Sequence, residues 1–211
     1  MPTENTFQLA PLRRRFYGLA KLDPPWRYET YSDAGKGKSA EQHYECWDLE
    51  RIFALPVADL ADPAGMWVWL YATAPMLPQA LECFARWGVT YVTMGVWVKM
   101  VKDGSRPTFG TGYALRNCHE PFLIGKVGKP RIHDKAIRSA ILEPRREHSR
   151  KPELGYEYAA RMAGPFPKAD IFARQQRPDW DSFGDQLTKF NPEAVDYEPL
   201  LIADESANLA A

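Results

Sequence analysis

The sequence predicts an α/β domain of three layers, in which helices cover both faces of a largely parallel β-sheet. Apolar segments of strand length alternate along the chain with amphipathic segments of helical period. One strand segment, Met66-Trp67-Val68-Trp69-Leu70, is wholly apolar, which is typical of a strand covered on both faces. A length of 211 residues, 45% of them hydrophobic, suits one domain with a substantial core.

The first half of the chain is expected to hold two strands and two helices. Apolar residues 16–22 predict a short buried strand, and residues 65–72 predict a second one. Asp48 is placed to cap a short helix that ends at Ala54. A helix is expected over residues 75–87, because Pro75 begins it, Gly88 follows it, and its apolar residues recur at helical spacing.

The second half adds four strands and one helix. The β-branched residues 89–101 predict a strand, and residues 121–124, 137–142 and 169–173 are further strand candidates. Pro152 introduces a helix over residues 153–162. Polar, glycine-containing residues 27–47 and 102–118 predict long loops, which often close over a ligand. We expect one domain over residues 1–187 and a loose acidic tail over residues 188–211.

The charges balance overall but are unevenly distributed. The sequence has 27 Lys and Arg and 27 Asp and Glu, so no global field attracts a polyanion. Residues 121–151 nevertheless hold nine basic and three acidic side chains, whereas residues 175–211 hold two basic and eight acidic ones. The basic segment indicates either a phosphate-contacting face or an ordinary solvated surface.

The composition argues against several classes of protein. Three cysteines without Cys-x-x-Cys spacing favour a reducing compartment over a disulfide framework, and the scattered histidines do not predict a metal site. No apolar run approaches the roughly 20 residues of a membrane span. The N-terminus shows no secretion signal, so we expect an intracellular protein.

The tetrapeptide Asp23-Pro24-Pro25-Trp26 directly follows the first predicted strand. Ligands of open α/β sheets bind outside the carboxyl ends of the strands, which makes this a place for chemistry. The carboxylate accepts hydrogen bonds, the prolines fix the backbone, and the tryptophan offers a flat aromatic face. The simpler interpretation is a rigid turn that ends a strand and buries a tryptophan.

Further motifs follow the tetrapeptide in a fixed order. They are His43-Tyr44, Leu55-Pro56-Val57, Val96-Trp97-Val98-Lys99, Phe109-Gly110-Thr111-Gly112-Tyr113, Glu120, the segment from Glu147 through His148 and Lys151 to Glu153, Ile171-Phe172-Ala173-Arg174, Trp180 and Gly184-Asp185-Gln186. Over residues 16–187 this series resembles the adenine-N6 methyltransferases named after the seventy-kilodalton subunit of methyltransferase A. The chain is more similar to the compact bacterial and phage members than to the eukaryotic messenger-RNA methylases.

The resemblance implies a Rossmann-like class I methyltransferase fold that uses S-adenosylmethionine, with a permuted motif order. Asp23, Pro24, Pro25 and Trp26 are then the catalytic residues. The carboxylate of Asp23 and the carbonyl of Pro24 would accept hydrogen bonds from the adenine amine and draw its lone pair out of the ring. Trp26 would stack on a base, a contact worth about 1–3 kcal/mol. Tyr28 and Glu120 are expected to line the adenine pocket.

The resemblance also implies a set of cofactor-binding residues. Lys151 is expected to face the carboxylate of S-adenosylmethionine, and Arg174 its ribose. Gln176, Asp185 and Gln186 are candidates for the ribose and adenine edges. The eukaryotic members have Arg-Pro-His-Asn and Gly-Asn-Gln where this chain has Arg174-Gln175-Gln176-Arg177 and Gly184-Asp185-Gln186, so individual contacts can differ. We interpret His148 as a positional or loop residue, because water can take the proton that the methylated amine loses.

These observations predict an adenine-N6 methyltransferase that acts on nucleic acid, with DNA favoured over RNA by the resemblance to bacterial and phage members. A cytoplasmic location is expected on the same ground. A non-catalytic nucleic-acid-binding partner subunit is the rival interpretation, and a methyltransferase of small amines is a more distant one. The predicted target specificity lies in the loops at 29–46 and 102–118.

Overall fold

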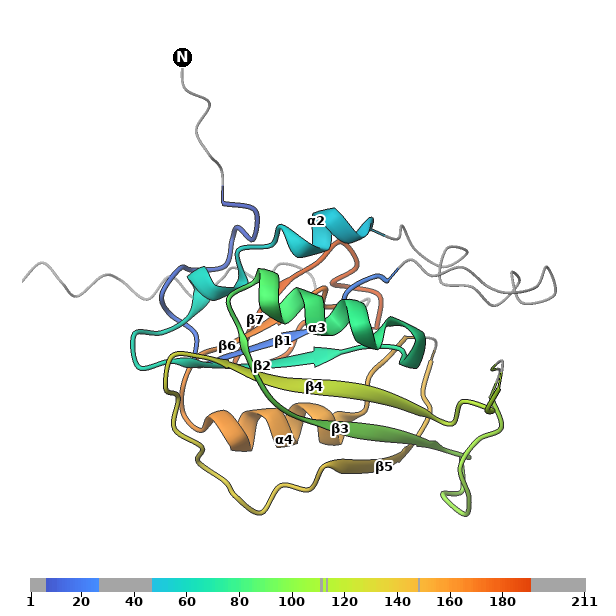
Figure 1. Ribbon diagram of the computed structural model, residues 1–211. Coiled ribbons are helices and arrows are strands. Elements are labelled where there is room, and N and C mark those ends of the chain that lie inside the picture. Colours follow the sequence, from blue (N-terminus) through green and yellow to red (C-terminus); the bar gives the residue numbers. More distant parts are fainter. Residues whose placement is uncertain (1–6, 27–46, 111, 113, 148, 191–211) are drawn as a thin grey trace, which may run out of the picture.

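The computed structural model describes residues 7–26, 47–110, 112, 114–147 and 149–190. Within them, seven strands form one sheet with helices on both faces (Figure 1). The strands are β1 (Leu19–Leu22), β2 (Met66–Tyr71), β3 (Thr90–Met100), β4 (His119–Val127), β5 (Ala140–Pro144), β6 (Lys168–Ile171) and β7 (Trp180–Phe183). The helices are α2 (Leu49–Phe53), α3 (Leu77–Arg86) and α4 (Glu153–Ala163), with the short 3₁₀ helices η2 (Val57–Leu60) and η3 (Ala74–Met76).

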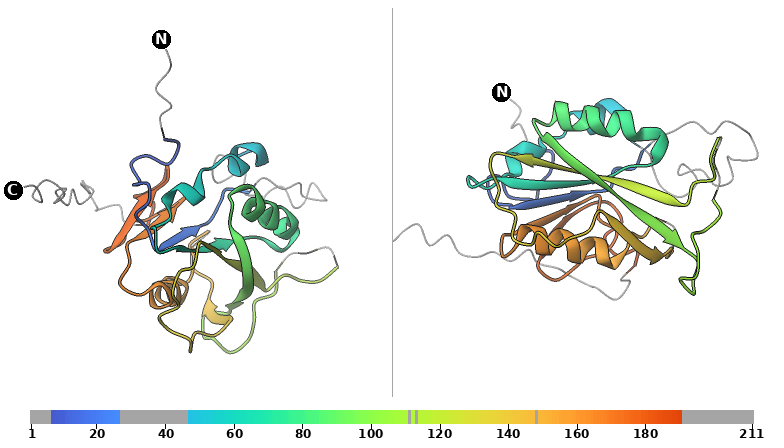
Figure 2. Two further views of the ribbon diagram at one scale, coloured as in Figure 1. Left: turned by 60° about the vertical axis from the view of Figure 1, so that its left-hand side comes forward. Right: turned by 60° about the horizontal axis from the view of Figure 1, so that its bottom comes forward.

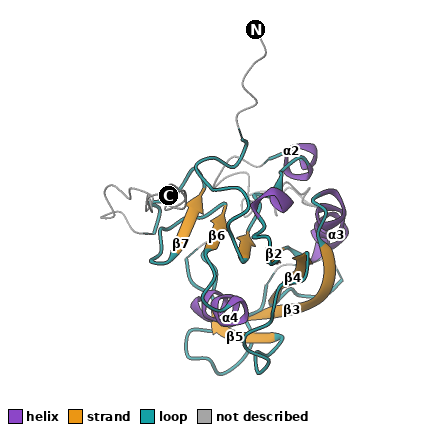
Figure 3. Cartoon of the chain, turned by 90° about the vertical axis from the view of Figure 1, so that its left-hand side faces the viewer, coloured by secondary structure: helices purple, strands orange, loops and turns teal. Residues whose placement is uncertain are grey.

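The sheet runs in the order β5-β3-β4-β2-β1-β6-β7, and among these strands only β4 is antiparallel to its neighbours. Helices α2 and α3 lie on one face and α4 on the other, as Figures 2 and 3 show. The predicted three-layer α/β fold with a largely parallel sheet is therefore confirmed. Because β4 is reversed, its first residues lie at the edge where the parallel strands end, and Glu120 lies there with Asp23.

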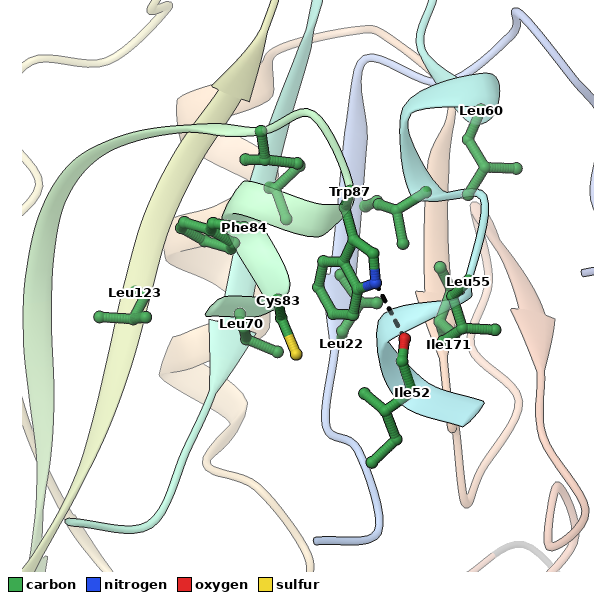
Figure 4. Close-up of a cluster of buried hydrophobic side chains, with 14 of the residues drawn as sticks. Leu22, Ile52, Leu55, Leu60, Leu70, Cys83, Phe84, Trp87, Leu123 and Ile171 are labelled. Carbon is green, nitrogen blue, oxygen red and sulfur yellow. Dashed lines mark hydrogen bonds between the residues drawn. The ribbon is translucent and has the colours of Figure 1, made fainter. Parts of the chain in front are cut away.

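The face of the sheet under α3 is packed by apolar side chains. Alternate residues of the strands, among them Leu22, Leu70 and Leu123, meet Phe84 and Trp87 of the α3 region (Figure 4). The indole N–H of Trp87 donates a hydrogen bond to the carbonyl oxygen of Ile52 over 2.9 Å, which ties α3 to α2. The buried indole thus keeps a partner for its polar atom.

The face toward α4 is aromatic and partly charged. Trp67, Trp69 and Tyr71 of β2 point to this face, and the ring of Trp69 stacks on Phe122 with a centroid separation of 4.2 Å. Since residues of a strand alternate between faces, Lys21 of β1 and Asp170 of β6 also lie on this side. Only 1% of the surface of each is exposed.

Several predicted bounds need correction. The first strand begins at Leu19 rather than at residue 16, and Tyr17 forms only an isolated bridge with Ala61. The last predicted strand ends at Ile171 rather than at residue 173, because Phe172 has a φ of 65° and turns the chain. The segments predicted at 121–124 and 137–142 are strands at 119–127 and 140–144.

One further difference concerns short elements, and part of the predicted tail and loop lies outside the described residues. Strand β7 and the 3₁₀ helix η2 were not predicted, and each is only four residues long. The described chain continues past residue 187, and the backbone N–H of Phe190 donates to the carbonyl of Arg174 over 3.2 Å. Residues 191–211 of the predicted tail and residues 27–46 of the first predicted loop lie outside the described residues. Among the described helices, each is too short or too polar to cross a lipid bilayer.

Candidate active site

The tetrapeptide that follows β1 is held by backbone hydrogen bonds. The N–H of Asp23 donates to the carbonyl of Ile171, the last residue of β6, over 3.3 Å. The N–H of Trp26 donates to the carbonyl of Pro24 over 2.8 Å, which closes a three-residue turn around Pro25. A carbonyl oxygen has two lone pairs, so that of Pro24 keeps one for a substrate. The turn and the two prolines fix where the Asp23 carboxylate and the Pro24 carbonyl lie.

Trp26 is a core residue of this turn. Only 4% of its surface is exposed, and its indole N–H donates to the carbonyl of Tyr71 over 3.2 Å. Its ring packs in the apolar cluster beneath α3. Stacking of a base on Trp26 therefore requires that the side chains around it move apart.

Asp23 belongs to a chain of alternating charges. The ammonium group of Lys151 lies 3.0 Å from Asp23 Oδ1 and 2.5 Å from Glu120 Oε1. The other oxygen of Glu120 lies 2.8 Å from the ammonium group of Lys99. Lys99 is the second-last residue of β3, beside the start of β4. Lys151 precedes Pro152, the N-cap of α4, so strand order and the connection to α4 bring the four residues together.

The two buried members of the cluster, Glu120 and Lys151, stabilise each other's charged forms. Burial alone would raise the pKa of Glu120, but the charges of Lys151 and Lys99 outweigh it and lower that pKa to about 2. Burial would likewise lower the pKa of Lys151, and Asp23 and Glu120 outweigh it and raise that pKa above its ordinary value. Asp23 thus faces an ammonium group that stays protonated at neutral pH.

A second charged group lies beneath the first. The ammonium of Lys21 is 3.2 Å from Asp170 Oδ1, and the hydroxyl of Tyr156 donates to Asp170 Oδ2 over 2.8 Å. The same ammonium lies 3.9 Å from the centre of the Tyr156 ring. Burial lowers the pKa of Lys21, and Asp170 opposes that change. The guanidinium carbon of Arg177 lies 3.6 Å from the centre of the Tyr156 ring, and Arg177 also pairs with Glu153 over 2.6 Å.

These two groups border one pocket at the carboxyl end of the sheet. Its lining is made of Lys21, Asp23, Ser149, Arg150, Lys151, Tyr156, Asp170, Phe172, Ala173, Arg174, Gln175, Arg177 and Phe190. Among the described non-glycine residues, four have a positive φ, and two of these, Ser149 (69°) and Phe172 (65°), line this pocket. Strained backbone of this kind clusters at functional sites, which marks the pocket as a candidate.

A second pocket adjoins the first and shares Phe172 and Arg174 with it. Its lining also includes Pro25, Trp47, Arg51, Phe183, Gly184, Asp185 and Gln186. Gly184 allows this arrangement, because a Cβ atom there would lie 2.5 Å from the carbonyl oxygen of Ala173. The segment after β7 can therefore close against the segment after β6.

The structure brings together most of the predicted site residues. Asp23 and Lys151 line the first pocket, Pro25, Asp185 and Gln186 line the second, and Arg174 lines both. Glu120 contacts Lys151, whereas Gln176 is half-buried and lines neither pocket. Tyr28, His148 and the His43-Tyr44 motif lie outside the described residues. The individual roles assigned to these residues remain predictions.

Sequence reasoning missed Lys21, Asp170, Tyr156 and Gln175 as pocket residues. A signal was present, since a lysine and an aspartate each interrupt an otherwise apolar strand segment. Opposite charges inside two buried strands indicate that the strands are neighbours, because a buried charge needs a partner. Gln175 carried no such signal.

The chain is similar to methyltransferases of several lengths, and it spans most of one of them and only part of the others. The type II methyltransferase M.MunI of Mycoplasma sp is 27% identical over 201 residues, which span 87% of this chain and 82% of that protein. A putative N(6)-adenosine-methyltransferase MT-A70-like of Medicago truncatula is 27% identical over 82% of this chain, which spans only 26% of that protein. The N(6)-adenine-specific methyltransferase METTL4 of Homo sapiens is 24% identical over 99% of this chain and 46% of that protein.

The family comparison covers the lining of both pockets except Phe190. The model of the MT-A70 family matches residues 17–186, from the residues just before β1 to the last residues of the second pocket. This match confirms the resemblance found in the motif series. The chain belongs to the MT-A70 family.

Proposed function

We propose that this chain transfers a methyl group from S-adenosylmethionine to the exocyclic N6 amine of adenine in nucleic acid. The observation that carries the proposal is a pair of adjacent acceptors held by backbone hydrogen bonds, the Asp23 carboxylate that lines the first pocket and the carbonyl of Pro24 next to it. The amine of adenine is a poor nucleophile because its lone pair is delocalised into the ring. Two acceptors on its hydrogens favour the more tetrahedral nitrogen of the transition state.

The side chains that line the two pockets suit the chemical groups of S-adenosylmethionine. The first is lined by five cationic and two anionic side chains, an environment suited to the carboxylate of the cofactor. The second combines Arg174, Asp185 and Gln186 with the rings of Phe172 and Phe183, a set suited to a ribose and an adenine. When bound, the cofactor would supply the methyl group from its sulfonium, and the neutral thioether S-adenosylhomocysteine would be the leaving group.

Lys151 can serve Asp23 and the cofactor at once. An ammonium group has three N–H donors, and Asp23 and Glu120 occupy two of them. The third can donate to the carboxylate of the cofactor. In this proposal Lys151 holds the Asp23 carboxylate in place and fixes the distance between the amine acceptor and the methyl donor. Water takes the proton that the methylated amine releases.

The connection between β3 and β4 supports a nucleic-acid substrate. It extends beyond the body of the molecule (Figure 1) and carries the exposed basic residues Lys102, Arg106 and Arg116. Phe109 and Leu115, 79% and 81% exposed, lie in the same connection. Basic groups that contact phosphates and an aromatic ring that stacks on bases are the two usual elements of single-strand binding.

We favour DNA over RNA as the polymer. This chain matches most of the length of a type II methyltransferase, whereas it spans about a quarter of the plant relative that is named for adenosine methylation. The favoured polymer also follows from the resemblance to compact bacterial and phage members. A cytoplasmic location is part of the same proposal.

The test is transfer of tritium from methyl-labelled S-adenosylmethionine to oligonucleotides. Single- and double-stranded DNA and RNA that contain adenine are compared with oligonucleotides of the same length that lack it. We expect label only in the adenine-containing set, and more in DNA than in RNA. Binding of oligonucleotides without any transfer would favour the non-catalytic partner subunit, and label in RNA alone would overturn the choice of polymer.

A further inference from the structure

Gln175 places an unpaired acceptor at the wall of the first pocket. The residue is 8% exposed, and its side-chain oxygen Oε1 is buried without a hydrogen-bond partner among the described residues. It follows Arg174 at the carboxyl end of β6 and lines the pocket together with Asp23 and Lys151. Buried polar atoms are nearly always paired in folded proteins, so one at a pocket wall that is unpaired among the described residues is a candidate partner for a bound ligand.

The charges of the pocket narrow the choice of that ligand. Its two carboxylates already have partners, since Asp23 pairs with Lys151 and faces the adenine amine in the proposed function, and Asp170 pairs with Lys21 and Tyr156. The remaining charged residues of the lining are cations. A positively charged ligand group in this pocket therefore finds its uncommitted acceptor at Gln175. A carboxylate of the ligand cannot pair with Gln175 Oε1, because both groups are hydrogen-bond acceptors.

We propose that Oε1 of Gln175 accepts a hydrogen bond from the α-ammonium group of S-adenosylmethionine. This inference rests on the proposed function, which places the amino-acid end of the cofactor in the first pocket. The ammonium and carboxylate of one ligand then take separate partners, Gln175 for the first and Lys151 for the second. The eukaryotic motif Arg-Pro-His-Asn has proline at the position of Gln175, so the contact is a feature of this chain and not of the shared motif.

A thermodynamic cycle tests the contact: one change removes the Gln175 side-chain amide from the protein, and the other removes the amino group from the ligand. Isothermal titration calorimetry measures the affinity of the full chain and of Gln175→Leu for S-adenosylhomocysteine and for its desamino analogue. Neither ligand carries a transferable methyl group, so the readout is binding and not turnover. A hydrogen bond to a charged group predicts that Gln175→Leu weakens S-adenosylhomocysteine binding by roughly ten- to a hundredfold and leaves the affinity for the desamino analogue unchanged.

Gln79 offers a matched control variant. It lies on α3, its side-chain oxygen is likewise buried without a partner among the described residues, and it lines neither of the two pockets. Gln79→Leu should leave the affinity for both ligands unchanged. In the absence of ligand, Gln175→Leu should unfold at the same temperature as the parent chain or higher, because it removes a buried polar atom that has no partner.

The outcomes separate this inference from the proposed function. If the parent chain binds S-adenosylhomocysteine and Gln175→Leu weakens the binding of both ligands equally, Gln175 only shapes the pocket and the inference is wrong. Unchanged affinity for both ligands overturns it as well. If the parent chain binds neither ligand, the proposed cofactor itself is wrong.

Discussion

The two faces of the sheet are built from different chemistry. The face under α3 is packed by apolar residues such as Leu22, Leu70 and Phe84. The face toward α4 and its edge hold the buried charged side chains of the described chain, Lys21, Asp170, Glu120 and Lys151. Apolar burial stabilises without directional requirements, whereas each buried charge stabilises only while its partner is present. We infer that the face under α3 mainly stabilises the fold. The charged residues on the face toward α4 mainly serve the site.

The largest expected effect on stability concerns the buried pair under the site. Lys21→Met leaves the Asp170 carboxylate buried without its cation, and this should lower the free energy of unfolding by about 3–5 kcal/mol. The double variant Lys21→Met/Asp170→Leu should cost less than the single change, since it removes both charges. Urea unfolding of the three proteins measures this coupling. If the loss of unfolding free energy in the double variant exceeds that of Lys21→Met alone, the two charges are not coupled.

A core change on the opposite face should act differently. Leu70 is fully buried under α3, and Leu70→Ala should lower the free energy of unfolding by about 2–5 kcal/mol through the cavity it leaves. Because no charge is disturbed, the pH dependence of unfolding should keep the shape of the parent curve. A change in the shape of the pH curve would contradict the inference that the face under α3 stabilises the fold without charged residues.

The smallest of these effects concerns pH. The pKa of Glu120 is lowered to about 2 in the folded chain, so its contribution to stability is complete above its unfolded pKa of about 4.3 and is lost as the pH falls toward 2. Glu120→Gln should therefore make the decline of unfolding free energy between pH 5 and pH 2 shallower than in the parent chain. Glu157→Gln, an exposed change on α4, is the control and should leave the slope nearly unchanged. An equal slope in parent and Glu120→Gln would mean that Glu120 is not held by Lys151 and Lys99.

The sequence predicted the apolar elements of this fold well, because their periodicity reports burial directly. Asp23 and Arg174 follow predicted strands, and parallel strands end at one edge, so both could be placed at the site from the sequence, whereas Asp185 and Gln186 were named through the family resemblance. The pairing of Lys21 with Asp170 could not be derived in the same way. It joins residues 149 positions apart and depends on β1 lying next to β6.

Strand β7 and the position of Lys151 could not be predicted from the sequence, for different reasons. Strand β7 has four residues, and its short run Trp180-Asp181-Ser182-Phe183 alternates too briefly to stand out from a loop. The position of Lys151 between Asp23 and Glu120 depends on the reversal of β4, which places the first residues of that strand at the carboxyl edge. Neither strand direction nor strand order can be derived from local periodicity.

The most direct test of the account compares the parent chain with Asp23→Asn. Both are incubated with adenine-containing DNA and S-adenosylmethionine that carries a trideuterated methyl group, and the nucleosides are then identified by mass spectrometry. Asp23→Asn keeps the shape of the side chain but removes the anionic acceptor, while Lys151 keeps Glu120 as a partner. We predict deuterated N6-methyladenine from the parent chain, a loss of about a hundredfold or more in Asp23→Asn, and closely similar affinities for S-adenosylhomocysteine. Label on another base, or turnover that survives in Asp23→Asn, would contradict the account.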